Sequence, residues 1–378
     1  MDNSVPSRRV RFTPILPTRY NPSGVHIQDA RFKSNLAAKE AMEHSIILAR
    51  LDANVQEIKS AYKRDRALIE LAHFDLFHMA RFLTAEHLFQ VHTPRAIQTL
   101  LDSPVFILVP GAFHPGSLYQ PLLDELTKQG YETHAITNRS VAGDDPENIT
   151  TQDDANYARG VITSYLDRGE DVVVICHSYG GLVGSTASYG LTKADRQAAG
   201  APGGVAGLIG IACLLVPEGV SLSEASGGQM ADWIDVNEPR EGLCVANSHD
   251  ALYGPEMAAK PAEGMLRKTA PQGTKVFASP PGKPAWSDPN MKGRLGYIKC
   301  LHDKAVSVEG QAGMLQMTGQ EWHVVHSDTG HSPFASKPVE TARYCLYLLE
   351  KFRLAAWLCT MALLLGSKCV RLWVTSLQ

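Results

Sequence analysis

The sequence predicts an α/β fold: a mostly parallel central sheet with helices on both faces. Three observations predict it. Between about residues 101 and 350, short apolar runs alternate with segments of helical periodicity. The runs are continuously apolar, as is typical of parallel strands buried on both faces and joined by crossover helices. The composition, 44% hydrophobic and 20% charged over 378 residues, is that of a globular chain able to bury a large core.

The elements follow one another in a regular order. The expected strands are 105–109, 131–136, 172–176, 205–213, 295–301 and 321–326. The expected helices are 118–129, 152–168, 180–190 and 338–352. Residues 217–293 interrupt the order, because they are rich in Pro, Gly, Met and Ala and too long for a simple connection. We expect them to form a lid over a substrate pocket in the domain 101–350.

The two ends of the chain differ from this domain. Residues 1–100 are expected to form an irregular arm and a helical extension, with apolar side chains at helical spacing between Ile47 and Tyr62. We favour an extension that covers the main domain over a hairpin for docking or homodimerisation. Residues 351–378 form an apolar and basic tail, and its run of about 13 apolar residues is too short to span a bilayer. Three interpretations stay open: an interfacial helix at a membrane, a helix packed on the domain, or a mistaken reading frame or splice junction.

Charge and cysteine content narrow the choice of partners and location. The first 100 residues carry 14 basic and 10 acidic side chains, whereas 101–350 is acidic and the whole chain has a net charge of −3. An acidic central body does not favour nucleic-acid binding. The seven cysteines form no C-x-x-C pair and no metal-ligand spacing, and the first residues lack the apolar run of a secretory signal. We therefore expect a cytoplasmic protein with reduced thiols, membrane-associated only if the tail makes it so, and no metal.

Residues 171–181 contain the strongest functional signal. They read Asp-Val-Val-Val-Ile-Cys-His-Ser-Tyr-Gly-Gly: a buried strand, a serine and the start of an apolar helix. This is the pattern of a nucleophile elbow with Ser178 at its tip, where the residues two before and two after the serine must be small. Gly180 meets that requirement, and Cys176 stands where glycine is usual.

A serine nucleophile needs a base and a carboxylate that orients it, here in the chain order Ser, acid, His. His331 follows an expected strand on a Gly-containing loop, and it is the candidate base. Asp303 follows the expected strand 295–301 and is the candidate acid. Asp250 is its competitor, but no strand precedes it, and Asp328 is expected to cap or turn the loop before His331.

A tetrahedral oxyanion needs two N–H donors. One is expected from the backbone of Tyr179, directly after the nucleophile. The other is expected from the loop 110–116, with Ala112 the first candidate and Phe113 the second. A simple strand-to-helix turn is the alternative interpretation of this loop.

These blocks together resemble the α/β-hydrolase superfamily, in particular its small esterase branch of plant methyl-ester esterases, hydroxynitrile lyases and salicylate-esterase-like proteins. The matching pieces are Val-Pro-Gly-Ala-Phe-His at 109–114, the elbow at 171–181, Cys-Leu-His-Asp-Lys-Ala-Val at 300–306 and Gly-His-Ser-Pro-Phe at 330–334. The resemblance implies a triad of Ser178, Asp303 and His331, with Ala112 and Tyr179 at the oxyanion, and no cofactor. The chain departs from the family at Pro110 and Cys176, where His and Gly are usual. Ser332 replaces the lysine of cyanohydrin-cleaving members, which counts against that lyase activity.

The sequence thus predicts a serine hydrolase that cleaves a small or medium carboxylic ester, or a thioester or lactone, through an acyl-enzyme. Apolar and aromatic residues of the expected lid indicate an apolar or aromatic substrate, although such residues are as often lid core as pocket wall. They are Met230, Trp233, Leu252, Tyr253 and Met257. Two alternatives remain: a lyase or cyclase on the same fold, or a catalytically silent binding protein.

Overall fold

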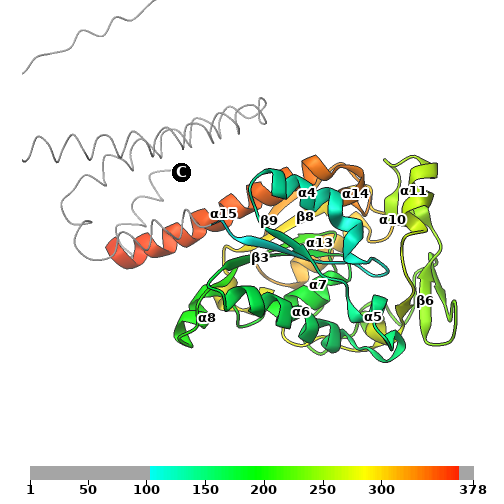
Figure 1. Ribbon diagram of the computed structural model, residues 1–378, viewed down its shortest axis with the longest axis horizontal. Coiled ribbons are helices and arrows are strands. Elements are labelled where there is room, and N and C mark those ends of the chain that lie inside the picture. Colours follow the sequence, from blue (N-terminus) through cyan, green and yellow to red (C-terminus); the bar gives the residue numbers. More distant parts are fainter. Residues whose placement is uncertain (1–102, 366–378) are drawn as a thin grey trace, which may run out of the picture. The chain divides into compact units, whose positions relative to one another are not determined.

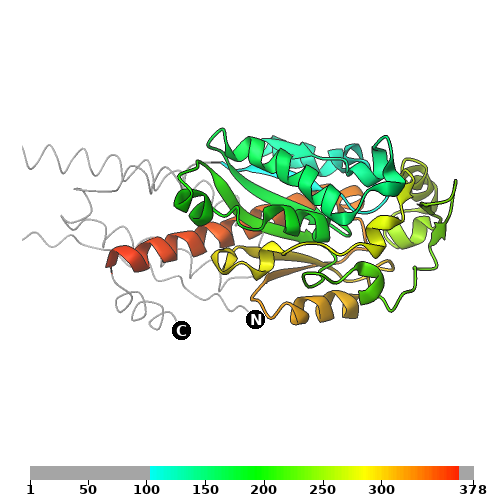
Figure 2. The ribbon, with the colours of Figure 1, turned by 90° about the horizontal axis from the view of Figure 1, so that it is seen from below.

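The computed structural model describes residues 103–365, shown as coloured ribbon in Figures 1 and 2. The predictions made for residues 1–100, and for the tail from residue 366 onward, lie outside the described residues. Within the described range the predicted fold class is confirmed: strands and helices alternate around one central sheet.

The central sheet has six strands in the order β2-β1-β3-β4-β8-β9, and every neighbouring pair is parallel. The strands are β1 (Val105–Val109), β2 (Thr133–Ala135), β3 (Asp171–His177), β4 (Gly204–Ile211), β8 (Leu295–Cys300) and β9 (His323–Ser327). All six strands predicted from the sequence are present. Because they are parallel, their carboxyl ends meet at one edge of the sheet, where ligand chemistry occurs in such folds.

Apolar residues of the inner strands face two separate cores. In β1, Ile107 and Val109 belong to one core while Phe106 and Leu108 belong to the other, as the period of two in a strand requires. Helices α6 (Thr151–Leu166), α7 (Gly180–Ser188) and α13 (Val308–Met317) contribute to the first core. Helices α4 (Gln120–Lys128), α14 (Pro333–Ser336) and α15 (Pro338–Leu365) cover the other face (Figure 1).

Local signals set several helix ends. Helix α6 starts at a capping box, in which the Thr150 hydroxyl accepts from the Asp153 N–H and the Asp153 carboxylate accepts from the Thr150 N–H. The short α8 (Lys193–Ala198) begins in the same way at Thr192 and Asp195. Helices α5 (Arg139–Ala142), α8 and α13 are not among the helices predicted from the sequence.

The predicted lid, residues 217–293, is an insertion between β4 and β8. It contains α9 (Leu222–Ala225), β5 (Ile234–Val236), β6 (Leu243–Ala246), α10 (His249–Tyr253), α11 (Ala259–Leu266), β7 (Gln272–Gly273) and α12 (Lys275–Ala278). Strands β5, β6 and β7 form a small antiparallel sheet, which the composition of the segment did not predict. Figure 1 shows α10, α11 and β6 at the same end of the domain as α5, which follows the carboxyl end of β2.

Helix α15 runs to Leu365, well beyond the predicted end at residue 352. The prediction ended too early because the apolar run that begins at Leu354 contains no helix breaker before Gly366. The helix docks through Phe352, whose ring lies where a side chain at Gly207 would stand. No helix between residues 103 and 365 is long and apolar enough to cross a membrane.

Candidate active site

Four connections at the carboxyl edge of the sheet carry the predicted site residues. The loop 110–116 follows β1, Ser178 follows β3, Asp303 follows β8 and His331 follows β9. The connections after β8 and β9 run side by side, since the Leu301 and His302 N–H groups donate to the Ser327 and Thr329 carbonyls. The sheet therefore gathers residues from the loop 110–116 to His331, which are far apart in the sequence, as the strand-end rule predicts.

Ser178 occupies a sharp turn between β3 and α7. Its φ is 50°, in the left-handed region that a side chain rarely adopts, and the residue is 8% exposed. Glycine is required on the helix side, because a Cβ at Gly180 would overlap the Val109 carbonyl oxygen and one at Gly181 that of Leu214. This strained strand-turn-helix geometry is that of a nucleophile elbow.

Cys176, the departure from the usual glycine, is accommodated by a second glycine. A Cβ added at Gly184 of α7 would overlap the Cys176 Sγ and lie 3.1 Å from Val109 Cγ2. The helix thus leaves at position 184 the space that the thiol fills. Burial raises the pKa of the Cys176 thiol well above its ordinary value, so the group is a neutral packing element.

Asp303 and His331 form a buried pair. The His331 Nδ1 lies 2.8 Å from Asp303 Oδ2, and the side chains are 1% and 0% exposed. The other carboxylate oxygen, Oδ1, accepts from the N–H groups of Ala305 and Val306, at 2.8 Å each. With Nδ1–H donating to the carboxylate, Nε2 of His331 keeps its lone pair, which is the tautomer that a base for a serine hydroxyl needs.

The competing carboxylates lie elsewhere. Asp250, on α10, forms a surface ion pair with Lys304 (Oδ2 to Nζ 2.6 Å) and is not a partner of His331. Asp328 is exposed and accepts from His302 Nε2 at 2.6 Å. The structure therefore brings Asp303, and neither competitor, to His331.

The loop after β1 leaves a single backbone N–H of residues 111–113 free. The Gly111 N–H donates to the Tyr119 hydroxyl (2.8 Å), and the Phe113 N–H donates to Gln272 Oε1 (2.8 Å). Within the described chain no hydrogen bond engages the Ala112 N–H. Of the two loop donors predicted for an oxyanion, Ala112 is the available one, while Phe113, with a φ of 67°, is already bonded.

Tyr179 is placed by its side chain. Its hydroxyl donates to Asp154 Oδ2 (3.0 Å), which also accepts from the Ser140 hydroxyl at 2.5 Å. Ser140 Oγ accepts in turn from Gln272 Nε2 (3.2 Å), which fixes the amide so that its oxygen faces Phe113. Burial raises the pKa of the Asp154 carboxyl. The Tyr179 N–H, like that of Ala112, has no hydrogen-bond partner among residues 103–365.

His177, which the sequence excluded as a base, joins three parts of the site. Its Nε2 donates to the His331 carbonyl (3.0 Å), so its Nδ1 accepts from the Tyr119 hydroxyl (2.7 Å). Its ring lies 4.7 Å from that of His331, centroid to centroid. Burial, followed by the nearby His331 and His114, holds the pKa of His177 well below 6.5, so the ring stays neutral.

His114 is a second buried imidazole that the sequence did not single out. Its Nδ1 donates to the Ala112 carbonyl (2.6 Å), and its Nε2 accepts from the Tyr253 hydroxyl (2.8 Å). Burial lowers its pKa to about 4. His114 and His177 lie inside the motifs 109–114 and 171–181, which could have indicated them. Tyr253 was expected only as a residue of the lid, and Gln272 carries no signal that links it to the site.

Apolar and aromatic residues of the insertion make two sets of contacts. Trp233 and Phe277 lie beside Phe113, with ring centroids 6.1 and 6.4 Å away. Leu252 and Tyr253 are 1% exposed and form a small core of the insertion, packed with the partly buried Met257. Trp233 also packs against this small core, and the Tyr253 hydroxyl bonds to His114, so both sets of residues connect the insertion to the loop 110–116.

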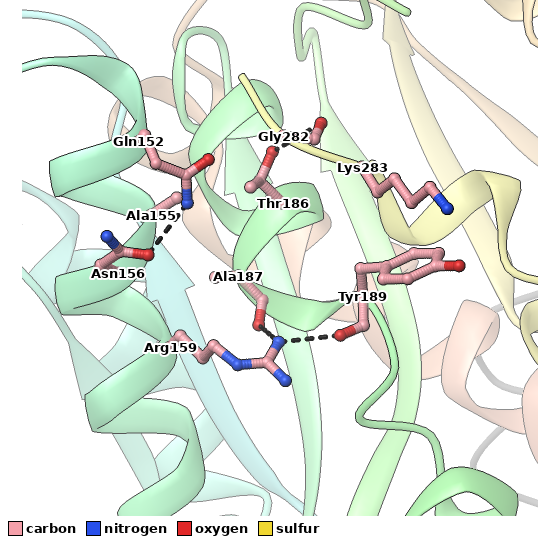
Figure 3. Close-up of a pocket in the computed structure, with 9 residues that line it drawn as sticks. All are labelled: Gln152, Ala155, Asn156, Arg159, Thr186, Ala187, Tyr189, Gly282 and Lys283. Carbon is pink, nitrogen blue, oxygen red and sulfur yellow. Dashed lines mark hydrogen bonds between the residues drawn. The ribbon is translucent and has the colours of Figure 1, made fainter. Parts of the chain in front are cut away.

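A hollow of about 320 Å³ lies between α6, the end of α7 and residues 282–283 (Figure 3). Arg159 donates to the carbonyls of Ala187 and Tyr189, which satisfies the end of α7, and Lys283 lies 5.5 Å from the Tyr189 ring centre. Both cations thus have structural partners, and none of the predicted site residues lines this hollow.

Known proteins resemble this chain over the same region. The profile of the family described as "Alpha/beta hydrolase family" matches residues 106–344. The chain is 28% identical over 239 residues to the alpha/beta hydrolase nvfD of Aspergillus novofumigatus, covering 62% of this chain and 92% of that protein. It is 27% identical over 256 residues to the probable hydrolase R7 of a Phoma species, covering 63% and 95%.

Solved structures share the fold. Polyneuridine aldehyde esterase aligns with a TM-score of 0.51 at 18% identity, over 65% of this chain and 99% of that chain. The methylesterase MES16 of Arabidopsis has a TM-score of 0.51 at 16% identity and the same coverage. Methylketone synthase I of tomato, complexed with 2-tridecanone, has a TM-score of 0.52 at 14% identity, over 66% and 99%. At these identities the likeness shows the fold alone.

Proposed function

The chain belongs to the alpha/beta hydrolase family, and from this premise we propose that it is a serine hydrolase that cleaves carboxylic esters through an acyl-enzyme at Ser178. The observation that carries the proposal is the buried His331–Asp303 pair, held at the same sheet edge as a serine with a φ of 50°. The hydrolase relatives, 28% and 27% identical to this chain, support it.

The reaction follows from the hydrogen-bond pattern. Ser178 Oγ attacks the ester carbonyl carbon while its proton passes to His331 Nε2. Asp303 holds the imidazole through Nδ1–H and stabilises the imidazolium that forms. His331 then gives the proton to the leaving alkoxide, and the acyl group stays on Ser178. Water reverses these steps: it loses a proton to His331, and Ser178 leaves with that proton as the acid is released.

The negative charge of each tetrahedral intermediate needs donors that have no other partner. The free N–H groups of Ala112 and Tyr179 meet this condition, because every other backbone N–H of residues 111–113 is bonded. Donors that are already in place stabilise the oxyanion far more than water does, because they need no reorganisation during the reaction. The pair Ala112 and Tyr179 is therefore the proposed oxyanion hole.

The substrate is proposed to be an apolar or aromatic ester, or a related thioester or lactone. Trp233 and Phe277 of the insertion lie against Phe113, the residue after the proposed donor Ala112. An acyl or alcohol group beside this donor would contact the aromatic rings of these three residues. The insertion thereby acts as the lid expected from the sequence.

Hydrolysis of p-nitrophenyl esters, from acetate to decanoate, tests the proposal. We expect turnover by the wild type, a loss of about 10³-fold or more in Ser178→Ala, and no change in the exposed control Ser164→Ala. A fluorophosphonate should label the wild type and not Ser178→Ala. Unchanged turnover in Ser178→Ala would refute the proposal. Labelling without turnover of any ester would favour a lyase or cyclase, and a folded protein that neither labels nor turns over would be a silent binding protein.

A further inference from the structure

The insertion bonds to the loop that carries the proposed oxyanion donor. The Phe113 N–H donates to Gln272 Oε1, and the Phe113 carbonyl accepts from the Ala270 N–H, at 2.8 Å each. The preceding carbonyl, that of Ala112, accepts from His114, which is oriented by the Tyr253 hydroxyl. Both ends of the peptide between Ala112 and Phe113 are therefore fixed by residues of the insertion, directly or through His114.

The residues of the insertion that follow Tyr253 also contact the loop that carries His331. Glu256 Oε2 accepts from the Gly330 N–H (2.8 Å), and Glu256 Oε1 accepts from the Ser336 hydroxyl (2.6 Å). The backbones approach so closely that a Cβ at Gly330 would overlap the Gly254 carbonyl oxygen. Gly330 directly precedes His331, so this contact fixes the backbone next to His331, whose carbonyl and ring are also held by His177 and Asp303.

We propose that Tyr253 and Glu256 are positioning residues for the reaction: Tyr253 orients the Ala112 donor through His114, and Glu256 orients His331 through Gly330. This inference rests on the proposed function. Neither side chain bonds to Ser178, Asp303 or the His331 ring in the described chain, so both act through the loops. Catalytic groups misplaced by about 1 Å lose roughly a hundredfold in rate, which makes such anchors functionally important.

A consequence concerns the motion of the lid. The segment from Tyr253 to Gln272 makes hydrogen bonds to both catalytic loops, so lifting the whole insertion would break them and displace the oxyanion donor. Residues 253–272 therefore hold both loops of the proposed site in place.

The test compares Tyr253→Phe and Glu256→Ala with the wild type in ester hydrolysis. Tyr253→Phe removes one hydroxyl and keeps the buried ring. We expect kcat to fall about tenfold with KM within about twofold. Affinity for a trifluoromethyl ketone, which forms a tetrahedral adduct, should fall by the same factor, while affinity for the product acid stays unchanged. A purely structural role would lower the melting temperature without this split.

Glu256→Gln provides the conservative rescue. Its amide oxygen can accept from Gly330 and its NH2 can donate to Ser336 Oγ, so it should recover most of the kcat lost in Glu256→Ala. Matched controls are Tyr157→Phe, a 42% exposed tyrosine of α6, and Glu263→Gln on α11, whose side chain is 49% exposed; both should behave as wild type. Should Glu256→Ala not fold, Ser336→Ala, which removes one of the two bonds, takes its place.

The outcomes separate the two proposals. Wild-type kcat and ketone affinity in Tyr253→Phe and Glu256→Ala, together with an inactive Ser178→Ala, would overturn the positioning roles and leave the hydrolase intact. Turnover that survives Ser178→Ala would instead overturn the proposed function. A loss of kcat in Glu256→Ala that Glu256→Gln does not recover would also count against the proposed role of Glu256.

Discussion

A double-mutant cycle at positions 176 and 184 tests how the elbow accommodates its unusual cysteine. Gly184 lies inside α7, where alanine is favoured over glycine by about 1 kcal/mol. A Cβ there would overlap the Cys176 Sγ, and forcing an extra methyl into a tight core costs about 1–3 kcal/mol. The steric cost exceeds the helical gain, so Gly184→Ala should destabilise the protein by about 1 kcal/mol.

Removing the thiol should turn the destabilising effect of Gly184→Ala into a stabilising one. In a Cys176→Ala background the nearest remaining atom is Val109 Cγ2, 3.1 Å from the new Cβ, and a side chain can yield by a few tenths of an ångström. Gly184→Ala should then stabilise by up to about 1 kcal/mol, giving a coupling of about 2 kcal/mol between the two sites. Cys176→Ala alone should cost about 1 kcal/mol for the lost buried sulfur.

Urea unfolding followed by circular dichroism measures all four members of the cycle. Gly160→Ala on α6 is the matched control, because a Cβ there meets nothing within 4 Å. It should show the helical gain alone, in either background. Equal destabilisation by Gly184→Ala with and without the thiol would refute the reasoning, since the obstacle would then not be Cys176.

Two further predictions concern the acid and the buried imidazole. Asp303→Asn should lower kcat for ester hydrolysis by about 10³–10⁴-fold with the fold preserved. Asp250→Asn loses only a surface ion pair and should leave kcat unchanged. The reverse pattern would refute the assignment of Asp303 as the acid. The pKa of His114 is lowered from 6.5 to about 4 in the folded protein. Between these pH values the unfolded chain binds a proton at this histidine and the folded protein does not, so the free energy of unfolding decreases as pH falls from about 6.5 towards 4. This shift corresponds to about 3 kcal/mol, and denaturant titrations from pH 7 to 4 should show a flatter stability curve for His114→Gln; parallel curves would contradict it.

The parts of the structure that could be predicted from the sequence are those governed by local pattern. Strands β1 and β3 contain continuous runs of buried apolar residues, so this pattern predicted β1 with its observed limits and β3 to within one residue at each end. Ser178 was recognisable because the elbow compresses strand, nucleophile and glycines into one short segment. Asp303 was found through a topological rule, since it directly follows a parallel strand.

Other features depend on contacts that no local pattern carries. Helix α13 was missed because Gly310 and Gly313 interrupt its apolar periodicity. The strands β5 to β7 are short, and they acquire their pairing only within the folded insertion. The partner of the Phe113 N–H, Gln272, lies 159 residues away, so the sequence could rank Ala112 above Phe113 as a donor but could not show why.

The two halves of the proposed oxyanion hole therefore have different origins. The Tyr179 N–H directly follows Ser178 in the strained turn of the elbow, and the bond from the Tyr179 hydroxyl to Asp154 also holds the residue. The Ala112 N–H is held indirectly: the Gly111 N–H bonds to Tyr119, the Ala112 carbonyl to His114, and the Phe113 N–H to Gln272, 159 residues away. The last two of these bonds depend on the insertion. Substitutions in the insertion should accordingly change the rate of the chemical step as well as substrate choice. The insertion would then act on the proposed chemistry as well as on the pocket, because its bonds, together with the Gly111–Tyr119 bond, hold the loop that carries the one free donor of residues 111–113.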